Sequence, residues 1–452
     1  MKQTARAVAF QTLSRVYQDG AYTNVALQHA LSTSNLAPRD KGLCTELVYG
    51  TIRRQITVDA LLQSYVKRRL SDLDPEVLTI LRMSVYQLAF LARVPAYAVI
   101  DEAVELAKRH VRSASGLVNG VLRSFGRDDL STDEKIDRVI GQKRVDDATR
   151  LGIRYGYPTW MVKRFVKAYG FDRASAILQA CNEPAPLTIR VNTLKTSVET
   201  MTVEMGQSGA IEVGAGRLSP YALTVHSTVD VETFEWYQQG YGTVQDEGAM
   251  LIAPLLHPAP GEHILDMCAA PGGKTTHIAE LQEDRGYIDA YDVYLQKVKT
   301  IQAAARRLGL QSITSRLGDG RDLKIAGKVY DAILVDAPCS GLGVMRRRPD
   351  IRHRRTASDI TALSKLQVEL LGAACRVVRS GGIVVYATCT LLPEENEQVV
   401  QTVLNEFAGT MTLEDISADV PALLRDDIQD GLVLTPERFG TDGFYMARLR
   451  KK

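Results

Sequence analysis

The chain has 452 residues, of which 45% are hydrophobic and 24% are charged, and its formal net charge is +2 at pH 7. This length suits about two to four domains, and the composition excludes a disordered or fibrous chain. The small net charge neither requires nor excludes a nucleic-acid partner, so local patches of charge must decide.

No stretch approaches the roughly 20 uninterrupted apolar residues of a membrane span, and we expect no membrane contact. The N-terminus "MKQTARAVAF" lacks the apolar core and the cleavage site of a signal peptide. The six cysteines include no C-x-x-C pair, which is typical of free thiols in a reducing compartment. We therefore expect a cytoplasmic protein.

The first part of the chain, residues 1–130, predicts helices throughout. Phe10, Leu13 and Tyr17 recur on one face of a helix. The run Asp74-Pro75-Glu76 combines a capping side chain, a proline for the first helical position and an acid for the first turn, which indicates a helix start. We expect a compact all-α domain here.

A charged segment, 126–145, follows and has the composition of a linker. Beyond it, "PLTIRVNTLK" (186–195) and "ALTVHSTV" (222–229) alternate between apolar and polar residues, as strands do. A helical pattern, 197–207, lies between them. We expect a small α/β domain over residues 146–250.

From residue 251 to 452, apolar strands alternate with helical patterns, which is the sequence form of a doubly wound parallel sheet. Ligands of such sheets bind outside the carboxyl ends of the strands. The predicted strands are 263–267, 287–292, 312–317, 332–336 and 383–388.

A glycine-containing turn, "LDMCAAPGGKTTHIAEL", joins the first of these strands to a helix. Gly272 and Gly273 let the backbone approach a ligand closely, but the turn is neither a dinucleotide G-x-G-x-x-G motif nor a Walker loop. Asp292 ends the next strand, where an acid can bind ribose hydroxyls. Asp319 ends the third strand, where its carboxylate can accept from the amino group of an adenine. Carboxylates without a phosphate-binding signature suggest S-adenosylmethionine.

Two strands end in a cysteine. "YDAILVDAPCSGLG" leads to Cys339 and "GGIVVYATCT" leads to Cys389. A pyrimidine C5 carbon is barely nucleophilic, and a thiolate that adds to C6 activates it through covalent catalysis. Asp336 stands where it can contact the base, which must be flipped out of structured RNA. A zinc site is disfavoured because paired ligand spacing is lacking. These residues alone leave open which thiol attacks.

A basic run, "MRRRPDIRHRR", follows the first cysteine and contains six arginines against one aspartate. The plain alternative is a solvated loop, but its place after a predicted active-site turn favours contacts with RNA phosphates. The predicted RNA-binding residues are Arg346, Arg347, Arg348, Arg352, Arg354 and Arg355.

Three stretches, "DMCAAPGGKT", "DAPCSGLGVMRRRPDIR" and "YATCTLLPEENE", resemble the RsmB (Sun/Fmu) family of bacterial 16S ribosomal RNA cytosine-C5 methyltransferases. The resemblance covers nearly the whole chain, since "RAVAFQTLSRV" and "LVYGTIRR" resemble the family's NusB-like helical domain and "IRVNTLK" its central RNA-binding segment. It implies a NusB-like domain, a small RRM-like RNA-binding domain and a Rossmann-like class I methyltransferase domain.

The resemblance also implies residue roles. Cys389 would be the nucleophile, Cys339 would assist product release, and Asp336 would contact the cytosine. S-adenosylmethionine would bind at Cys268, Ala269, Ala270, Pro271, Gly272, Gly273, Lys274, Asp292, Asp319 and Asp336. The partner would be a flipped-out cytosine of 16S ribosomal RNA, with no obligate protein partner and no metal.

Other functions remain open. The same chemistry on transfer RNA is a close alternative. An RNA-binding assembly or transcription factor with an inactive methyltransferase domain is another, and the intact Cys389, Asp336 and Lys274 disfavour it. A small-molecule methyltransferase would not need the two additional RNA-type domains.

Overall fold

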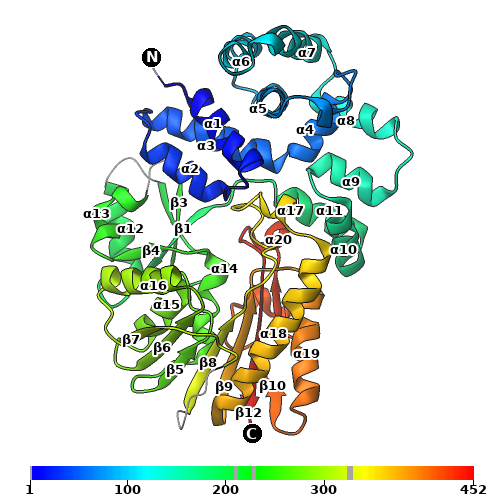
Figure 1. Cartoon of the computed structure of the whole chain (residues 1–452). Helices are drawn as coiled ribbons and strands as arrows, with labels where there is room; N and C mark the ends of the chain where they lie inside the picture. The colour runs from blue at the N-terminus through cyan, green and yellow to red at the C-terminus, as the bar shows by residue number, and fades with distance from the viewer. Residues whose placement is uncertain (1–2, 208–211, 227–230, 323–328) are drawn as a thin grey trace. The chain divides into compact units, whose positions relative to one another are not determined.

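The computed structural model describes residues 3–207, 212–226, 231–322 and 329–452 (Figure 1). The chain forms two compact units. The helical unit comprises the residues up to Asn182 together with Arg347–Arg354, and the sheet unit comprises Glu183–Arg346 and Arg355–Lys452. Each is described by itself below.

The helical unit surrounds one apolar core to which Phe10, Leu13, Leu47 and Ile80 contribute. The predicted helix start at Asp74 is confirmed, because its carboxylate accepts hydrogen bonds from the backbone N–H groups of Glu76 and Val77. The helices are α1 (Ala5–Gln18), α2 (Thr23–Ser32), α3 (Pro38–Arg53), α4 (Gln55–Leu62), α5 (Pro75–Phe90), α6 (Ala96–His110), α7 (Ser115–Arg127), α8 (Thr132–Gly141), α9 (Asp147–Tyr155), α10 (Thr159–Tyr169), α11 (Phe171–Ala180) and α17 (Ile351–Arg354).

The helical run continues to Ala180, beyond residue 146, where we expected the α/β domain to start. The last helices before the sheet are short and are separated by Gly156 and Gly170, both of which have a positive φ. Glycine adopts that conformation at little cost. Glycines at such short intervals resemble the turns between β-strands. Each helix between them is too short to show a clear helical period in the sequence, so the start of the α/β domain was predicted too early.

The sheet unit begins with a four-stranded antiparallel sheet in the order β2-β3-β1-β4. The predicted strands near 186–195 and 222–229 are confirmed as β1 and β3, although residues 227–230 lie outside the described residues, and the helix predicted at 197–207 is α12. The elements are β1 (Leu187–Val191), α12 (Val198–Gln207), β2 (Glu212–Ala215), β3 (Ala222–His226), α13 (Glu235–Gln238), β4 (Gly242–Val244) and α14 (Glu247–Met250).

An eight-stranded sheet follows, in the order β10-β12-β9-β8-β5-β6-β7, with β11 pairing with β12. All five predicted strands are present as the parallel strands β5 to β9, and β10, β11 and β12 join antiparallel. The elements are β5 (His263–Asp266), α15 (Gly273–Leu281), β6 (Tyr287–Asp292), α16 (Leu295–Leu308), β7 (Ile313–Leu317), β8 (Tyr330–Asp336), α18 (Ala357–Val377), β9 (Val378–Thr388), α19 (Glu397–Glu406), β10 (Met411–Leu413), β11 (Leu432–Leu434), α20 (Pro436–Phe439) and β12 (Phe444–Lys451).

The large sheet is buried on both faces. Successive residues of one strand, Ile264 and Leu265, belong to two different apolar clusters, and so do Leu334 and Val335. Strands buried on both faces have nearly continuous apolar sequences, which is why these were predicted correctly.

The strand order reverses between β5 and β8, since the chain runs from β5 through β6 to β7 and then returns to β8 on the other side of β5. Such a switch point opens a crevice at the carboxyl ends of the strands. A ligand site is therefore expected at these strand ends.

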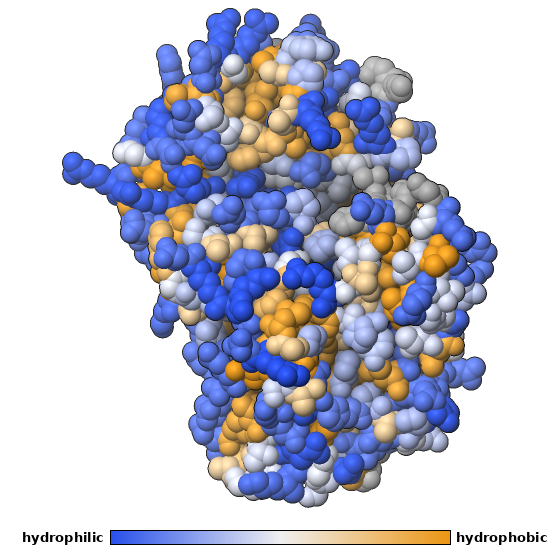
Figure 2. All heavy atoms as spheres, turned by 180° about the vertical axis from the view of Figure 1, so that it is seen from behind, coloured by the Kyte–Doolittle hydropathy of each residue, from blue (hydrophilic) through white to orange (hydrophobic). Residues whose placement is uncertain are grey.

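In the part of the chain that the structure describes, no helix is long and apolar enough to cross a membrane. Figure 2 shows one face of the molecule as a mosaic, in which smaller hydrophobic patches lie among hydrophilic side chains.

Candidate active site

The two cysteines predicted at strand ends meet in the structure. Cys339 follows β8 and Cys389 follows β9, and these strands are parallel neighbours with Asp336 opposite Ala387. The two Sγ atoms are 3.3 Å apart. Neither cysteine is in a disulfide, and both are partly exposed. A substrate at the carboxyl end of the sheet could therefore reach both sulfur atoms.

A lysine and an aspartate lie beside the thiols. The Nζ atom of Lys274, from the start of α15, donates to Oδ2 of Asp336 over 2.7 Å. Burial lowers the pKa of Lys274, but the charges of Asp336 and Cys389 raise it more, so that the pKa lies above its ordinary value. The crevice therefore contains a fixed ammonium group close to Cys389.

A buried polar network lies behind the thiols, and we call it the Glu395 network. The Glu395 side chain, which is 0% exposed, accepts from the backbone N–H of Ser340 over 2.8 Å and from Nε2 of Gln367 over 3.0 Å. Its other oxygen accepts from Oγ of Ser340 over 2.5 Å and from Oγ1 of Thr390 over 3.3 Å. Ser340 and Thr390, which directly follow Cys339 and Cys389, also contact each other over 2.8 Å.

The environment of Cys339 disfavours its ionised form. Its hydrogen bond to Cys389 raises the pKa of Cys339 well above the ordinary value, and burial and the negative charges of Cys389 and Glu395 add to this effect. The two neighbouring thiols are therefore unequal, since the Lys274 ammonium interacts with Cys389.

The predicted cofactor turn, Cys268–Lys274, is supported by a buried acid. Asp266 ends β5 and is 0% exposed. Its carboxylate accepts from Oγ1 of Thr275 over 2.7 Å and from the backbone N–H of Cys268 over 3.4 Å. Burial raises the pKa of Asp266 to about 7. Asp266 therefore holds both ends of the turn, at Cys268 and at Thr275.

The small antiparallel sheet supports the same turn from another side. Arg190, from β1, is buried and forms an ion pair of 2.9 Å with Glu280 of α15. It also donates to the carbonyl of Gly273 over 2.6 Å and to Oγ1 of Thr276 over 3.0 Å. A buried ion pair is tolerated when such additional hydrogen bonds satisfy it.

The remaining predicted cofactor residues lie at the next two strand ends. Asp292 ends β6 and accepts from the backbone N–H of Tyr294 over 3.1 Å. Asp319 follows β7 and pairs with Arg321 at 2.7 Å, and hydrogen bonding to Arg321 lowers the pKa of Asp319. Val293 and Leu317, beside these acids, are 51% and 57% exposed. Apolar surface next to carboxylate acceptors suits the faces and hydroxyl groups of an adenosine.

Two of the six predicted RNA-binding arginines are buried. Arg346 donates to the carbonyls of Gly440 and Pro184 over 2.7 and 2.6 Å within the sheet unit. Arg352 is 0% exposed and lies 3.8 Å from the ring centre of Tyr157 within the helical unit. Its guanidinium donates to the carbonyls of Arg53 and Cys181 and to Oδ1 of Asn182. Both side chains have a structural role.

The other arginines differ among themselves. Arg355 donates to the carbonyls of Ser340 and Cys339 over 3.0 and 3.1 Å, so it holds the turn of the first thiol. Arg354 pairs with Asp350 at 3.2 Å and lies 4.4 Å from the ring centre of Tyr22. Arg347 is partly buried and Arg348 is exposed.

Sequence reasoning missed the residues that support the site. Glu395 lies in "LLPEENE", which contributed only to the family resemblance, and Asp266 lies within the predicted strand 263–267 without a role of its own. Asn396 was missed as well, although it accepts from Oγ1 of Thr388 and donates to the carbonyl of Thr390, on both sides of Cys389. The available signal was an acid cluster directly after a cysteine-bearing strand end.

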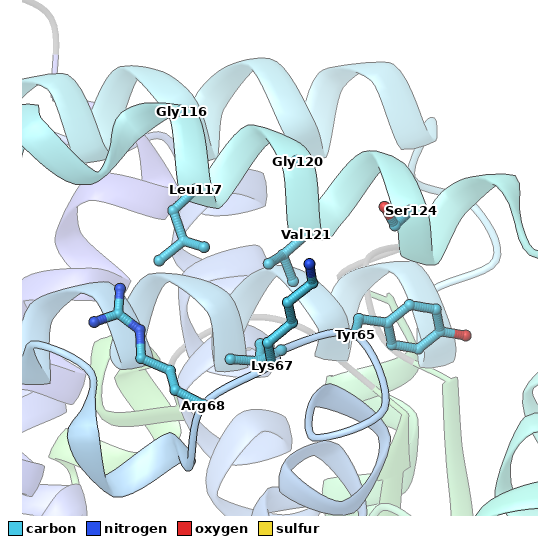
Figure 3. Close-up of a pocket in the computed structure, with 9 residues that line it drawn as sticks. Tyr65, Lys67, Arg68, Gly116, Leu117, Gly120, Val121 and Ser124 are labelled. Atoms are coloured by element: carbon cyan, nitrogen blue, oxygen red, sulfur yellow. The ribbon is translucent and has the colours of Figure 1, made fainter.

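A pocket of about 500 Å³ lies in the helical unit, apart from the predicted site residues. Figure 3 shows Lys67 and Arg68 on one side of it, facing the small residues Gly116 and Gly120 of α7. These two cations belong to a basic stretch, Val66–Leu70, of the helical domain. None of the thiols or strand-end acids lines the pocket.

The sequence profiles of three families match the chain in order. NusB matches residues 3–127, a ferredoxin-like domain of RsmF/B-like methyltransferases matches 157–232, and the 16S rRNA methyltransferase RsmB/F family matches 253–450. These matches give the class, a ribosomal RNA methyltransferase that depends on S-adenosylmethionine.

Full-length relatives are more specific. The chain is 36% identical over 457 aligned residues to a probable ribosomal RNA small subunit methyltransferase B of Bacillus subtilis, with 100% of both chains covered. It is 33% identical to ribosomal RNA small subunit methyltransferase B of Escherichia coli O1:K1, covering 100% of this chain and 99% of the relative. The chain belongs to the RsmB family of 16S ribosomal RNA methyltransferases.

Solved structures agree with this assignment. The crystal structure of PH0851 superposes with a TM-score of 0.81 at 25% identity, and the match covers 100% of both chains. NSun6 from Pyrococcus horikoshii superposes with a TM-score of 0.57 at 25% identity, covering 64% of this chain and 97% of that one. The expected NusB-like domain, small central α/β domain and Rossmann-like methyltransferase domain are confirmed, and the central one matches a ferredoxin-like profile.

Proposed function

We propose that the protein methylates C5 of a cytosine in 16S ribosomal RNA through a covalent adduct between a cysteine and C6 of the base. The observation that carries this proposal is the 3.3 Å contact between the Sγ atoms of Cys339 and Cys389 at adjacent strand ends. A methyltransferase acting on oxygen or nitrogen needs no such pair, because its target atom already has a lone pair. Two thiols that reach the same base suit a reaction in which a covalent adduct must first form and later break.

The strand ends fit S-adenosylmethionine. Asp292 would accept from the ribose hydroxyls and Asp319 from the adenine amino group, while Cys268 to Lys274 would line the rest of the site, with Asp336 at its inner end. A Cβ built on Gly273 would meet only Gln245, at 4.0 Å, so the turn leaves space for a ligand. The bound cofactor supplies an electrophilic methyl group.

Cys389 is the proposed nucleophile. A cation near a thiol favours the thiolate, which is the reactive form, and the Lys274 ammonium interacts with this sulfur. The thiolate adds to C6 of the cytosine, and the electron pair moves to C5, which can then accept the methyl group. Asp336 contacts N3 of the base and stabilises the adduct.

Cys339 is the proposed release residue. After methylation the C5 proton must be removed so that the bond between C6 and Cys389 can break and the double bond can re-form. A base such as water takes the C5 proton, the C5–H electron pair re-forms the C5=C6 double bond, and Cys389 leaves C6 as a thiolate. Cys339 lies against Cys389 and assists this elimination as a neutral thiol that donates a hydrogen bond to the departing sulfur. An inactive methyltransferase domain is disfavoured, because Cys339, Cys389, Asp336 and Lys274 come together at these strand ends.

The RNA substrate would present its cytosine flipped out of a structured loop, because neither thiol can reach a stacked base. Of the six arginines, Arg348 and Arg354 are exposed. Arg354 also donates to the carbonyls of Gly20 and Ala21, so Arg348 is the stronger candidate for a phosphate contact. Arg346 and Arg352 are occupied by carbonyl groups. The proposal needs no protein partner and places the reaction in the cytoplasm, where free thiols persist.

Bisulfite sequencing of ribosomal and transfer RNA tests the proposal. A strain that lacks the protein should lose one 5-methylcytosine signal in 16S ribosomal RNA and regain it when the intact gene is restored. Loss of a transfer RNA signal instead would move the activity to that substrate. If every cytosine methylation persisted, the proposed reaction would be wrong.

A further inference from the structure

We propose that Glu395 is a positioning residue of this reaction, which ties the turn of Cys339 to the turn of Cys389 and makes the two thiols unequal through its buried negative charge. The inference rests on the proposed function for its catalytic meaning. It concerns a residue that contacts neither the cytosine nor the cofactor.

The hydrogen bonds show how the two turns are tied. One carboxylate oxygen of Glu395 accepts from the backbone N–H of Ser340, and the other accepts from the hydroxyls of Ser340 and Thr390. Each hydroxyl belongs to the residue directly after a thiol. A single side chain therefore fixes the separation of two turns that are distant in sequence, and thereby the 3.3 Å between the sulfur atoms.

Glu395 is itself held in place. It belongs to the short turn Pro393–Glu395 between β9 and α19, and its backbone carbonyl accepts from the hydroxyl of Tyr386 over 2.6 Å. Gln367 of α18 donates both to its carboxylate and to the carbonyl of Pro338. Because groups on two flanking elements orient it, the carboxylate cannot turn away from the thiols without breaking several buried bonds.

Charge distinguishes the thiols. The charged and titratable groups that act on Cys339 are Cys389, Glu395 and, through Cys389, the Lys274–Asp336 pair, and the Tyr386 hydroxyl lies nearby. Arg355 binds the backbone carbonyl of Cys339. The negative charge of Glu395 acts on Cys339, whereas the ammonium group of Lys274 interacts with Cys389. Cys339 stays a neutral thiol in the resting protein and does not compete for C6.

The test uses the full-length protein without RNA. Glu395→Gln keeps the shape and most hydrogen bonds but removes the charge. Iodoacetamide labelling followed by peptide mass spectrometry gives the labelling rate of each cysteine as a function of pH. The half-maximal pH of Cys339 labelling should fall, and kcat on 16S ribosomal RNA should fall about tenfold or more, with KM for S-adenosylmethionine changed by less than about threefold. The matched control is Glu394→Gln, which removes the neighbouring charge and should leave the Cys339 profile in place.

An unchanged Cys339 profile in Glu395→Gln would overturn the inference, whatever the protein's substrate proves to be. Because labelling needs no RNA, it is independent of whether cytosine C5 is the target. If Glu395→Gln does not fold, Glu395→Asp decides, since it keeps the charge but shortens the reach. It should retain the labelling profile and lose kcat, and wild-type kcat would contradict the positioning role.

Discussion

The two halves of the crevice are built differently. On the side of β8 and β9, the residues after each thiol are completely buried and are held by the Glu395 network. On the side of β6 and β7, Val293, Tyr294 and Leu317 are largely exposed around Asp292 and Asp319. A group that takes part in bond formation gains from being fixed before the substrate arrives, whereas a cofactor site must let its ligand enter and leave in every cycle. Under the proposed mechanism, the rigid side is therefore the one where bonds form and break.

The strongest test of the fixed half is removal of the thiols. Cys389→Ala should lower kcat by at least about a thousandfold and abolish covalent RNA adducts, because the nucleophile is lost. Cys339→Ala should instead accumulate an adduct that survives denaturing gel electrophoresis, because release fails.

Cys44→Ala is the control for these thiol variants, since Cys44 is buried in the core of the helical unit. It should form no persistent adduct. If Cys339→Ala formed no adduct while Cys389→Ala did, the two roles would be reversed.

The open half is tested at Asp292. Asp292→Ala should raise KM for S-adenosylmethionine about 10- to 100-fold, because a hydrogen bond to a charged group contributes about 1.5–3 kcal/mol. At saturating cofactor, kcat should change far less, since the thiols and the Glu395 network are untouched. Initial rates over a range of cofactor concentrations measure both constants. A large loss of kcat with an unchanged KM would show that this half is not the cofactor side.

Asp266, which supports the turn between the halves, is tested through the stability of the fold. Its folded pKa of about 7 exceeds the ordinary value of 3.8, so between these values the folded state holds a proton that the unfolded chain has lost. The free energy of unfolding from this group therefore falls as pH rises from about 4 to 7, by at most about 1.4 kcal/mol per pH unit.

Asp266→Asn should remove this slope in urea unfolding followed at several pH values. Asp426→Asn, at an exposed position, is the control and should keep the slope of the unmodified protein. A slope that survives in Asp266→Asn would show that another group causes it.

Much of the sheet unit could be predicted because its chemistry lies at ends of unmistakable strands. Cys339, Cys389 and Asp336 each follow an apolar run that is buried on both faces, and parallel strands bring their carboxyl ends to one edge. The role of Glu395 could not be predicted in this way. The proposed role of Glu395 depends on its hydrogen bonds from Ser340 and Thr390. These residues come close to Glu395 only through tertiary packing.

For the basic run, the sequence pointed to a role that the structure does not support for every arginine. A guanidinium donates equally well to a phosphate or to a backbone carbonyl, so a row of arginines has the same sequence in either role. Arg346, Arg352 and Arg355 bind carbonyl groups. Burial decides between the two roles, and charge alone carries no information about burial.

The short segment Arg347–Arg354 has a consequence for anyone who wishes to divide this protein. The chain leaves the sheet unit after Arg346, contributes these eight residues to the helical unit and returns at Arg355. A truncated protein that starts after Asn182 would lack Tyr157, against which Arg352 packs. It would also lack the carbonyls of Arg53 and Cys181, to which Arg352 donates. The loose segment would then lie in sequence between the Cys339 turn and Arg355, which clasps that turn. A single cut after Asn182 therefore does not separate the two folding units, because Arg347–Arg354 stays with the sheet unit in sequence.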